Sequence, residues 1–511
     1  MKIPVLKNTM TNYLIMGIRL IEGILVTRWI LGHLGKENYG LWAILWSFFC
    51  YALLLDFGFG VAARKSTSVE LYRTDPDRYN RTVTLIFSFH MAMAALILLG
   101  TGIASCFVPL LLNVKPDAPE LSYYRACFLC FGIGSALVFP FGIFSEILIG
   151  LQRLYLRNYI NIISKLVELA GVLIVFRFGG GLISLIVFTV CLMALTQFAM
   201  MFFVLRLIPG MRLGFRLMPD RELFRELFHF SGHIGLISVT RLIAVRSRAL
   251  LVSMFCGLGA AGSFQLGGRI PALIGQLTGP YQENVSPITA RLHSRKKSKP
   301  LGRILCNSMR WNSFLAIPLS CATVLFAGPL IRFLFHIDDA EAVDVCRVVA
   351  VSTWLWLAFW AIPEAYFMMA EKHRFLSRFK LGSCLLQIGL AVVVLPFFGV
   401  VPFVWSMLGS EVFLVLAVLL PVFLGGTGIG VFALLRDVLL RPFAAMLPAA
   451  VAWLAEIRYF SGAVSDFWLL VIAGATGAIL YPIASFFAIA GRNERAKIIK
   501  TVYTYLGIMQ S

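Results

Sequence analysis

The chain consists of long apolar segments separated by short polar ones. Segments of about 20 apolar residues match the length that an α-helix needs to cross a membrane. We identify fourteen such segments, at residues 11–33, 38–62, 82–109, 122–148, 158–178, 181–205, 228–256, 264–288, 304–333, 345–369, 381–399, 402–424, 442–455 and 467–490. Their length excludes an outer-membrane barrel, whose strands have about 10 residues of alternating polarity. The pattern therefore predicts an all-α, polytopic membrane protein with about 14 transmembrane helices.

Composition supports this assignment. Of 511 residues, 59% are hydrophobic and 14% are charged, whereas soluble proteins have about 45–50% apolar and about 25% charged residues. This excludes a disordered chain, a coiled coil and an ordinary soluble enzyme. The first apolar segment contains Arg19, Glu22 and Arg28, whereas a secretory signal has an uninterrupted apolar core, so we expect a retained first helix.

Basic residues fall mainly on one side of the predicted membrane. With the N-terminus in the cytoplasm, cytoplasmic segments carry 30 Lys and Arg residues. External connections carry only Lys36, Lys115, Arg177 and Arg458. The positive-inside rule therefore predicts that both termini are cytoplasmic. The basic run Arg295–Lys299 is then expected to face anionic lipid rather than nucleic acid.

The sequence offers no basis for catalysis. It contains no G-x-x-x-x-G-K-[ST] motif for ATP, and its ten cysteines are scattered through the spans. The predicted external loops are too short to build a site for sugar chemistry. We therefore expect neither an enzyme nor a bound cofactor or metal.

Several cations fall inside the predicted spans. Five of them lie near span ends and are expected to extend to the membrane surface, namely Arg28, Arg125, Arg310, Arg332 and Arg347. Arg19, Lys165 and Arg241 lie deeper, where a charge costs at least about 2.5–3.5 kcal/mol. Such residues face partners or a water-filled cavity.

Polar residues in four spans form helical stripes. Arg241 and Arg248 share one face of their helix, and Arg19 is followed by Glu22 at i, i+3. The other stripes combine Asn158, Asn161, Lys165 and Glu168, and Gln265, Arg269, Gln276 and Glu283. Each could be an internal salt-bridge seam, but the cations outnumber the carboxylates. Because arginine matches phosphate oxygens bidentately, we predict a cationic lumen for a phosphate-bearing substrate.

A weak internal repeat suggests two lobes. Leu34-Gly35 and Leu258-Gly259 each precede a few small or polar residues and then an aromatic residue that opens a span. The offset of 224 residues predicts a first lobe at 1–206 and a second at 207–424. Residues 425–511 would add a helix pair and a cytoplasmic tail.

Three local motifs resemble a known family. Leu34–Trp42 (LGKENYGLW), Leu54–Gly60 (LLDFGFG) and Gly150–Arg153 (GLQR) are similar to Wzx-type polysaccharide flippases of the multidrug/oligosaccharidyl-lipid/polysaccharide (MOP) superfamily. This resemblance implies two MATE-like lobes around a central cavity in the bacterial cytoplasmic (inner) membrane. It implies transfer of an undecaprenyl-diphosphate-linked oligosaccharide to the outer leaflet, alongside a polysaccharide polymerase and glycosyltransferases.

The resemblance gives the polar stripes expected roles. The diphosphate and sugars would contact the lumen residues Arg19, Lys165, Arg241, Arg248, Arg269, Gln265 and Gln276. Gating or coupling candidates are Glu22, Asp56, Glu168 and Glu283, with Asp56 placed near the cytoplasmic end of its helix. A murein-precursor (lipid II) flippase, a MATE-type drug antiporter and a membrane polymerase or ligase are the alternatives.

Overall fold

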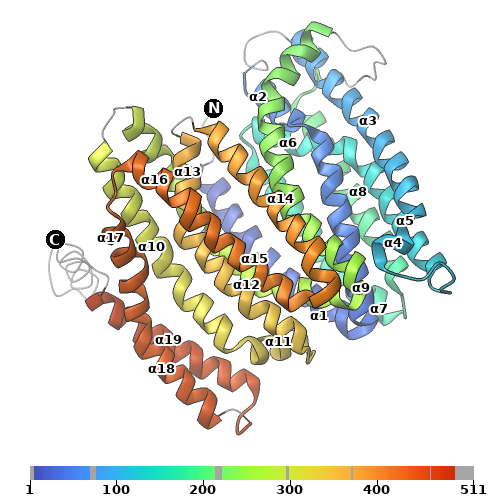
Figure 1. Ribbon diagram of the computed structural model, residues 1–511. Coiled ribbons are helices and arrows are strands. Elements are labelled where there is room, and N and C mark those ends of the chain that lie inside the picture. The colour runs from blue at the N-terminus through green and yellow to red at the C-terminus, as the bar shows by residue number, and fades with distance from the viewer. Residues whose placement is uncertain are drawn as a thin grey trace. The chain divides into compact units, whose positions relative to one another are not determined.

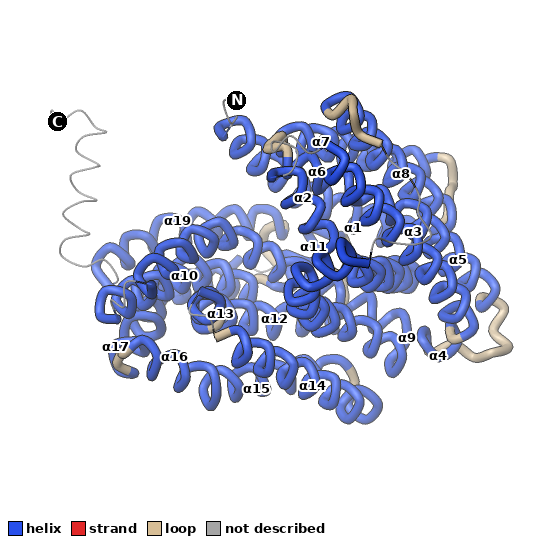
Figure 2. The backbone as a smooth tube through the Cα atoms, turned by 90° about the horizontal axis from the view of Figure 1, so that it is seen from above, coloured by secondary structure: helices blue, strands red, loops and turns tan. Residues whose placement is uncertain are grey.

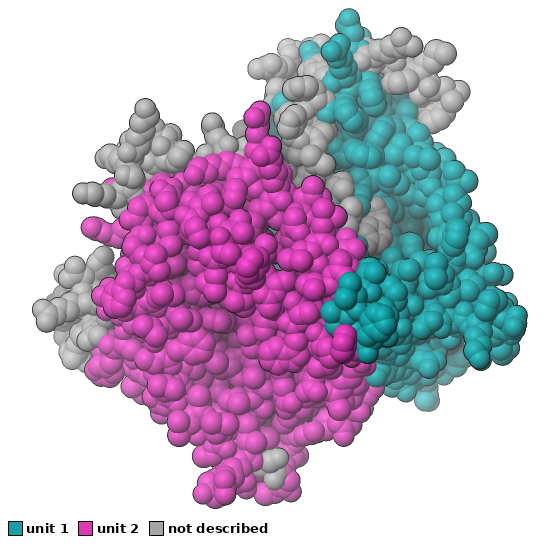
Figure 3. All heavy atoms as spheres, viewed as in Figure 1, with its two compact units in different colours: residues 1–263, 391–397 teal, residues 264–390, 398–511 magenta. Residues whose placement is uncertain are grey.

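The computed structural model describes residues 5–69, 76–212, 214, 221–294, 298–369, 372–460 and 462–488. All its helices and strands there are helices, joined by short loops (Figure 2). The predicted all-α class is confirmed. The chain divides into two compact units (Figure 3), residues 1–263 with 391–397 and residues 264–390 with 398–511.

The first unit comprises the helices up to the middle of α9 (Figure 1). They are α1 (Val5–Ala52), η1 (Leu53–Asp56), α2 (Phe59–Val69), α3 (Pro76–Cys106), α4 (Val108–Leu112), α5 (Leu121–Val138), η2 (Phe139–Gly142), α6 (Ile143–Gly150), α7 (Leu154–Arg177), α8 (Leu182–Leu207) and α9 (Arg221–Ser294).

The second unit contains the remaining helices and the end of α9. They are α10 (Ser298–Leu325), α11 (Ala327–Phe335), α12 (Ala340–Phe359), α13 (Ala361–Met369), α14 (His373–Phe398), α15 (Val400–Leu414), η3 (Val415–Leu419), α16 (Leu420–Thr427), α17 (Val431–Leu434), η4 (Leu435–Leu440), α18 (Arg441–Phe460) and α19 (Asp466–Ala488). Residues 391–397 of α14 belong to the first unit.

The predicted apolar segments all fall on these helices. Among the described residues, ten helices are long and apolar enough to cross a membrane, and α10 with α11 forms a further candidate that bends by 81°. A multi-pass membrane protein is therefore supported. The count of 14 spans and the cytoplasmic position of both termini stay predictions.

Each unit has a densely packed apolar interior. In the first, Phe59, Tyr79 and Phe144 are buried where α2, α3, α6 and α8 meet. In the second, Trp453 and Tyr481 join α18 and α19 to α10, and the Tyr481 hydroxyl donates to the Phe314 carbonyl at 2.8 Å. The predicted additional pair is thus anchored by aromatic packing, which is the main source of helix association in lipid.

Two long helices break at glycines. Gly35 in α1 has φ 78° and Gly257 in α9 has φ 88°, a left-handed conformation that favours glycine. The breaks are 257 − 35 = 222 residues apart, so the offset of 224 that paired Gly35 with Gly259 is wrong by two residues. The structural offset aligns Arg19-Leu20-Ile21 with the identical Arg241-Leu242-Ile243.

The segments after these breaks cross each other through glycine. A Cβ atom on Gly40 would collide with the Leu258 carbonyl and lie 3.2 Å from the Gly262 nitrogen. A Cβ atom on Gly262 would lie 2.7 Å from the Lys36 carbonyl. Since 262 − 40 and 258 − 36 are both 222, the contact is reciprocal. The same repeat offset therefore governs both the helix breaks and the crossing.

Candidate functional site

A polar seam joins α1 to α7 in the first unit. Lys165 Nζ lies 2.6 Å from Glu168 Oε2 and 3.4 Å from Glu22 Oε1. The side chains of Glu168 and Glu22 are only 11% and 12% exposed. One ammonium group therefore lies between two poorly hydrated carboxylates, as expected for an internal salt-bridge seam. The substrate contact of Lys165 and the gating role of Glu22 and Glu168 stay predictions.

The same seam continues toward the N-terminal ends of both helices. Asn158 Nδ2 donates to Thr11 Oγ1 at 3.1 Å and to Asn12 Oδ1 at 2.6 Å. Asn8 Oδ1 accepts the Tyr155 amide at 2.9 Å. Polar pairs of this kind hold two membrane helices in a fixed register. They fix which residues of α1 and α7 lie side by side.

A cluster of arginines lies at this end of the first unit. Arg64 Nε on α2 donates to Glu146 Oε2 on α6 at 2.8 Å. Arg157, in the first turn of α7, is attracted by Glu146 and repelled by Arg19 and Arg64. The Arg157 Nε is buried without a hydrogen-bond partner among the described residues. Three guanidinium groups thus share one carboxylate, an excess of two positive charges that favours an anion.

Sequence reasoning missed two members of this cluster. Arg64 and Arg157 were assigned to the predicted cytoplasmic loops 63–81 and 149–157. In the structure, α2 and α7 extend into those segments. One signal was available, because stepping back eight residues from Lys165 along the polar face reaches Arg157.

Asp56 occupies a break between η1 and α2. Its two carboxylate oxygens accept the amides of Gly58 at 3.1 Å and Gly60 at 2.9 Å. His90 Nε2 on α3 lies 2.8 Å from Asp56 Oδ1, and the histidine is buried. Phe57 has φ 47°, so the chain turns sharply here. Asp56 therefore lies at an interruption within the span and not near its cytoplasmic end, because α2 continues the helix beyond it.

The cations of α9 are only partly described. Arg248, predicted to face the lumen, is half-buried, and the side chain of Arg241 lies outside the described residues. Arg246 was given no lumen role. It is half-buried, interacts electrostatically with Cys50 of α1, and has a buried Nε without a partner in the described part of the chain. Arg246 is therefore an additional candidate.

The other predicted lumen residues belong to the second unit. Gln265 is half-buried, whereas Arg269 and Gln276 are exposed. The Glu283 side chain lies outside the residues that the structure describes. A cavity shared by these residues and those of the first unit stays a prediction.

The predicted surface arginines have different surroundings. Arg310 was expected near a span end, but α10 begins at Ser298, so this residue lies within the helix and is 7% exposed. Its guanidinium lies 5.5 Å from the centre of the Trp311 ring. By contrast, Arg347 has a side chain that is 48% exposed, and its Nη1 donates to Asp344 Oδ1 at 3.0 Å. The expected surface position is wrong for Arg310.

Comparison with known families now complements this geometry. The sequence profile of the family described as "Polysaccharide biosynthesis protein" matches residues 33–337, which is more than half of the chain. The chain belongs to this family. The match includes the helices that carry Arg64, Glu146 and Arg157, and it supports the predicted Wzx-like character.

Solved structures of the MOP superfamily share the fold of this polysaccharide biosynthesis protein. Lipid II flippase MurJ in an inward closed conformation aligns with a TM-score of 0.70 at 14% identity, over 94% of this chain and 98% of that chain. An inward-facing multidrug resistance MATE family transporter aligns with a TM-score of 0.65 at 14% identity, over 80% and 93%. At this identity the likeness shows the fold alone. No curated protein matches the sequence significantly.

Proposed function

We propose that the protein is a flippase for a polyprenyl-diphosphate-linked oligosaccharide, the repeat unit of a surface polysaccharide. It would carry this lipid from the inner to the outer leaflet of the bacterial inner membrane by alternating access. The observation that carries the proposal is the cluster of Arg19, Arg64 and Arg157 around Glu146 in a member of a polysaccharide biosynthesis family.

The chemistry of the cluster fits the charged part of such a substrate. A diphosphate offers several anionic oxygens, and guanidinium groups bind such oxygens in pairs. The three arginines come from α1, α2 and α7, so they converge from different helices. The donor set would hold the diphosphate while the hydrocarbon tail stays in lipid. Glu146 would limit the affinity, because it already neutralises part of the charge.

The membrane potential would assist export. Moving about two negative charges outward through an inside-negative potential of about 100 mV gains roughly 4–5 kcal/mol. This free energy alone would favour the outer leaflet. The proposal therefore requires no coupling ion.

Complementation tests the role of the arginine cluster. Arg157→Ala removes both the charge and the fork, so it should abolish surface glycan in a strain that lacks its own flippase. Arg157→Lys keeps the charge without the bidentate fork, and it should restore part of the display. Surface glycan is measured by labelling, and the amount of protein in the membrane by blotting.

Arg347→Ala is the matched control, because Arg347 is exposed and already paired with Asp344. It should leave surface glycan unchanged, since exposed pairs contribute about 0–1 kcal/mol. Normal glycan display with Arg157→Ala at a normal membrane level would show that the cluster is structural.

A murein-precursor flippase is the second candidate, supported by the fold shared with lipid II flippase MurJ. The two candidates differ in the sugar head and not in the diphosphate. Expression of this chain in cells depleted of their murein flippase separates them. Rescue of growth would favour the second candidate, and display of surface polysaccharide without rescue would favour the first.

A further inference from the structure

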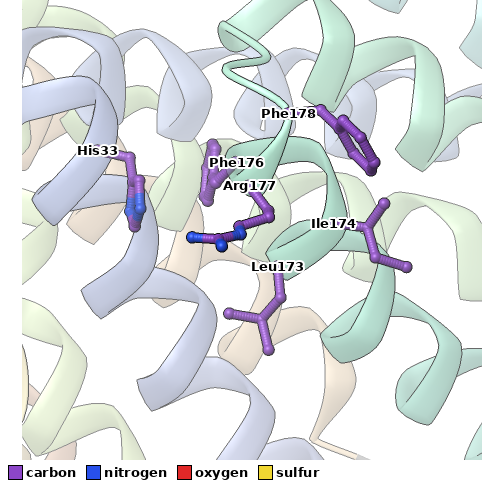
Figure 4. A pocket seen from close by; sticks show the side chains of 6 residues that line it. All are labelled: His33, Leu173, Ile174, Phe176, Arg177 and Phe178. Carbon is purple, nitrogen blue, oxygen red and sulfur yellow. The ribbon is translucent and has the colours of Figure 1, made fainter.

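A hollow of about 380 Å³ lies at the C-terminal end of α7, far from the arginine cluster. It is lined by His33, Leu173, Ile174, Phe176, Arg177 and Phe178 (Figure 4). Arg157 and Arg177 are 20 residues apart on one helix, which corresponds to about 30 Å. The hollow is therefore a separate place on the first unit.

Two nitrogen-rich side chains face each other across this hollow. Arg177 and His33 point toward one another (Figure 4). The His33 ring stacks on Phe176 with centroids 4.7 Å apart, and its Nδ1 lies 3.0 Å from the Trp29 carbonyl. That contact assigns the proton to Nδ1, so protonation of Nε2 would add a second cation. No carboxylate is among the lining residues, and Arg177 has no ion pair within the described part of the chain.

An apolar stripe leads along α7 to this pair. Its side chains are exposed and spaced at i, i+3 and i+4, and they are Ile163, Leu166, Val167, Ala170, Leu173 and Ile174. The next position of the stripe is Arg177, and Phe178 beside it is 85% exposed. A charged end on a continuous apolar stripe is the pattern of a side chain at the membrane–water interface.

We propose that this hollow binds the phosphate headgroup of an anionic glycerophospholipid, with its acyl chains along the α7 stripe. In the predicted topology this lipid belongs to the outer leaflet. Arg177 in the last turn of α7 also offsets the helix dipole. That role accounts neither for the facing histidine nor for the hollow between them. A freely soluble anion would make no use of the apolar stripe.

Native mass spectrometry of the purified full-length protein tests the site. The delipidated protein is titrated with phosphatidylglycerol, phosphatidylcholine or inorganic phosphate. Wild type should retain phosphatidylglycerol preferentially. Arg177→Gln should lower the first phosphatidylglycerol adduct at least about fivefold, the equivalent of about 1 kcal/mol. His33→Gln should act in the same direction, so the result does not depend on one variant folding.

Arg458→Gln is the matched control, because Arg458 is also an exposed arginine in the last turn of a membrane helix. It should leave the adducts unchanged. Equal losses with Arg177→Gln and Arg458→Gln, or no loss with either, would overturn the proposal. Competition by inorganic phosphate, or stronger retention of undecaprenyl diphosphate than of phosphatidylglycerol, would reject a glycerophospholipid as the occupant.

Discussion

At the scale of single residues, the partners of a charge decide its role. Lys165 was expected to contact the substrate because a cation deep in a membrane segment needs compensation. Its compensation is present in the fold itself, since Glu22 and Glu168 both lie within 3.4 Å of Nζ. Arg157 differs, because two of its three charged neighbours are cations. The free energy of an incoming anion is therefore more favourable at Arg157.

Lys165→Met tests this distinction. The change leaves two poorly hydrated carboxylates without their cation, which should destabilise the protein by about 3 kcal/mol. Combination with Glu168→Gln should recover part of that loss. The measurement is thermal unfolding of the purified variants in detergent.

Asp344→Asn serves as the comparison, because its partner Arg347 is exposed and the pair contributes about 0–1 kcal/mol. If Lys165→Met unfolds like wild type but loses surface glycan, the lysine acts on substrate and the seam is not its main role.

At the scale of secondary-structure elements, glycines set how α1 and α9 cross. Gly40 and Gly262 permit a backbone-to-backbone approach that no larger residue allows. Small residues serve the same purpose at other helix contacts in membranes. The reciprocal spacing of 222 residues shows that both repeats use the same surface for this contact.

Gly40→Ala should therefore destabilise the protein by about 1–3 kcal/mol, since the added methyl group meets a backbone carbonyl that cannot rotate away. Gly262→Ala should do the same. Thermal unfolding measures both. Gly32→Ala in the same α1 is the control, because nothing lies within 4 Å of the added atom. It should be neutral or stabilising by up to about 1 kcal/mol. Equal effects at Gly32 and Gly40 would contradict a close crossing.

At the scale of the whole molecule, charge asymmetry is the basis for orientation. The cytoplasmic side is predicted to hold 30 Lys and Arg residues and the external connections only four. Insertion follows this bias because positive residues are retained in the cytoplasm. Orientation also decides which leaflet contacts the hollow at Arg177.

Reporter fusions check the orientation. A fluorescent protein fused within Arg295–Lys299 or at the C-terminus should fold, because both sites are predicted to be cytoplasmic. Alkaline phosphatase fused after Lys115 should be active outside. Active phosphatase in the 295–299 loop would reverse the predicted topology.

The sequence by itself determined the class of the protein. Apolar segments of membrane length and a biased charge distribution are local properties, so they predicted an all-helical membrane protein without any knowledge of contacts. The motifs near Leu34 and Leu54 indicated the family for the same reason. Helical periodicity also predicted correctly that Lys165 lies in a polar stripe with Asn158 and Glu168.

Only the tertiary structure decided which charges meet. Arg64 and Glu146 are 82 residues apart in the chain, and Lys165 and Glu22 are 143 apart. Periodicity places a residue on a face of its own helix but does not identify the helix opposite. The exact repeat offset was likewise set by packing, because Gly257 and Gly262 act through their contacts with α1 and not through local sequence. Pairing across helices therefore distinguished the compensated Lys165 from the cationic cluster at Arg157.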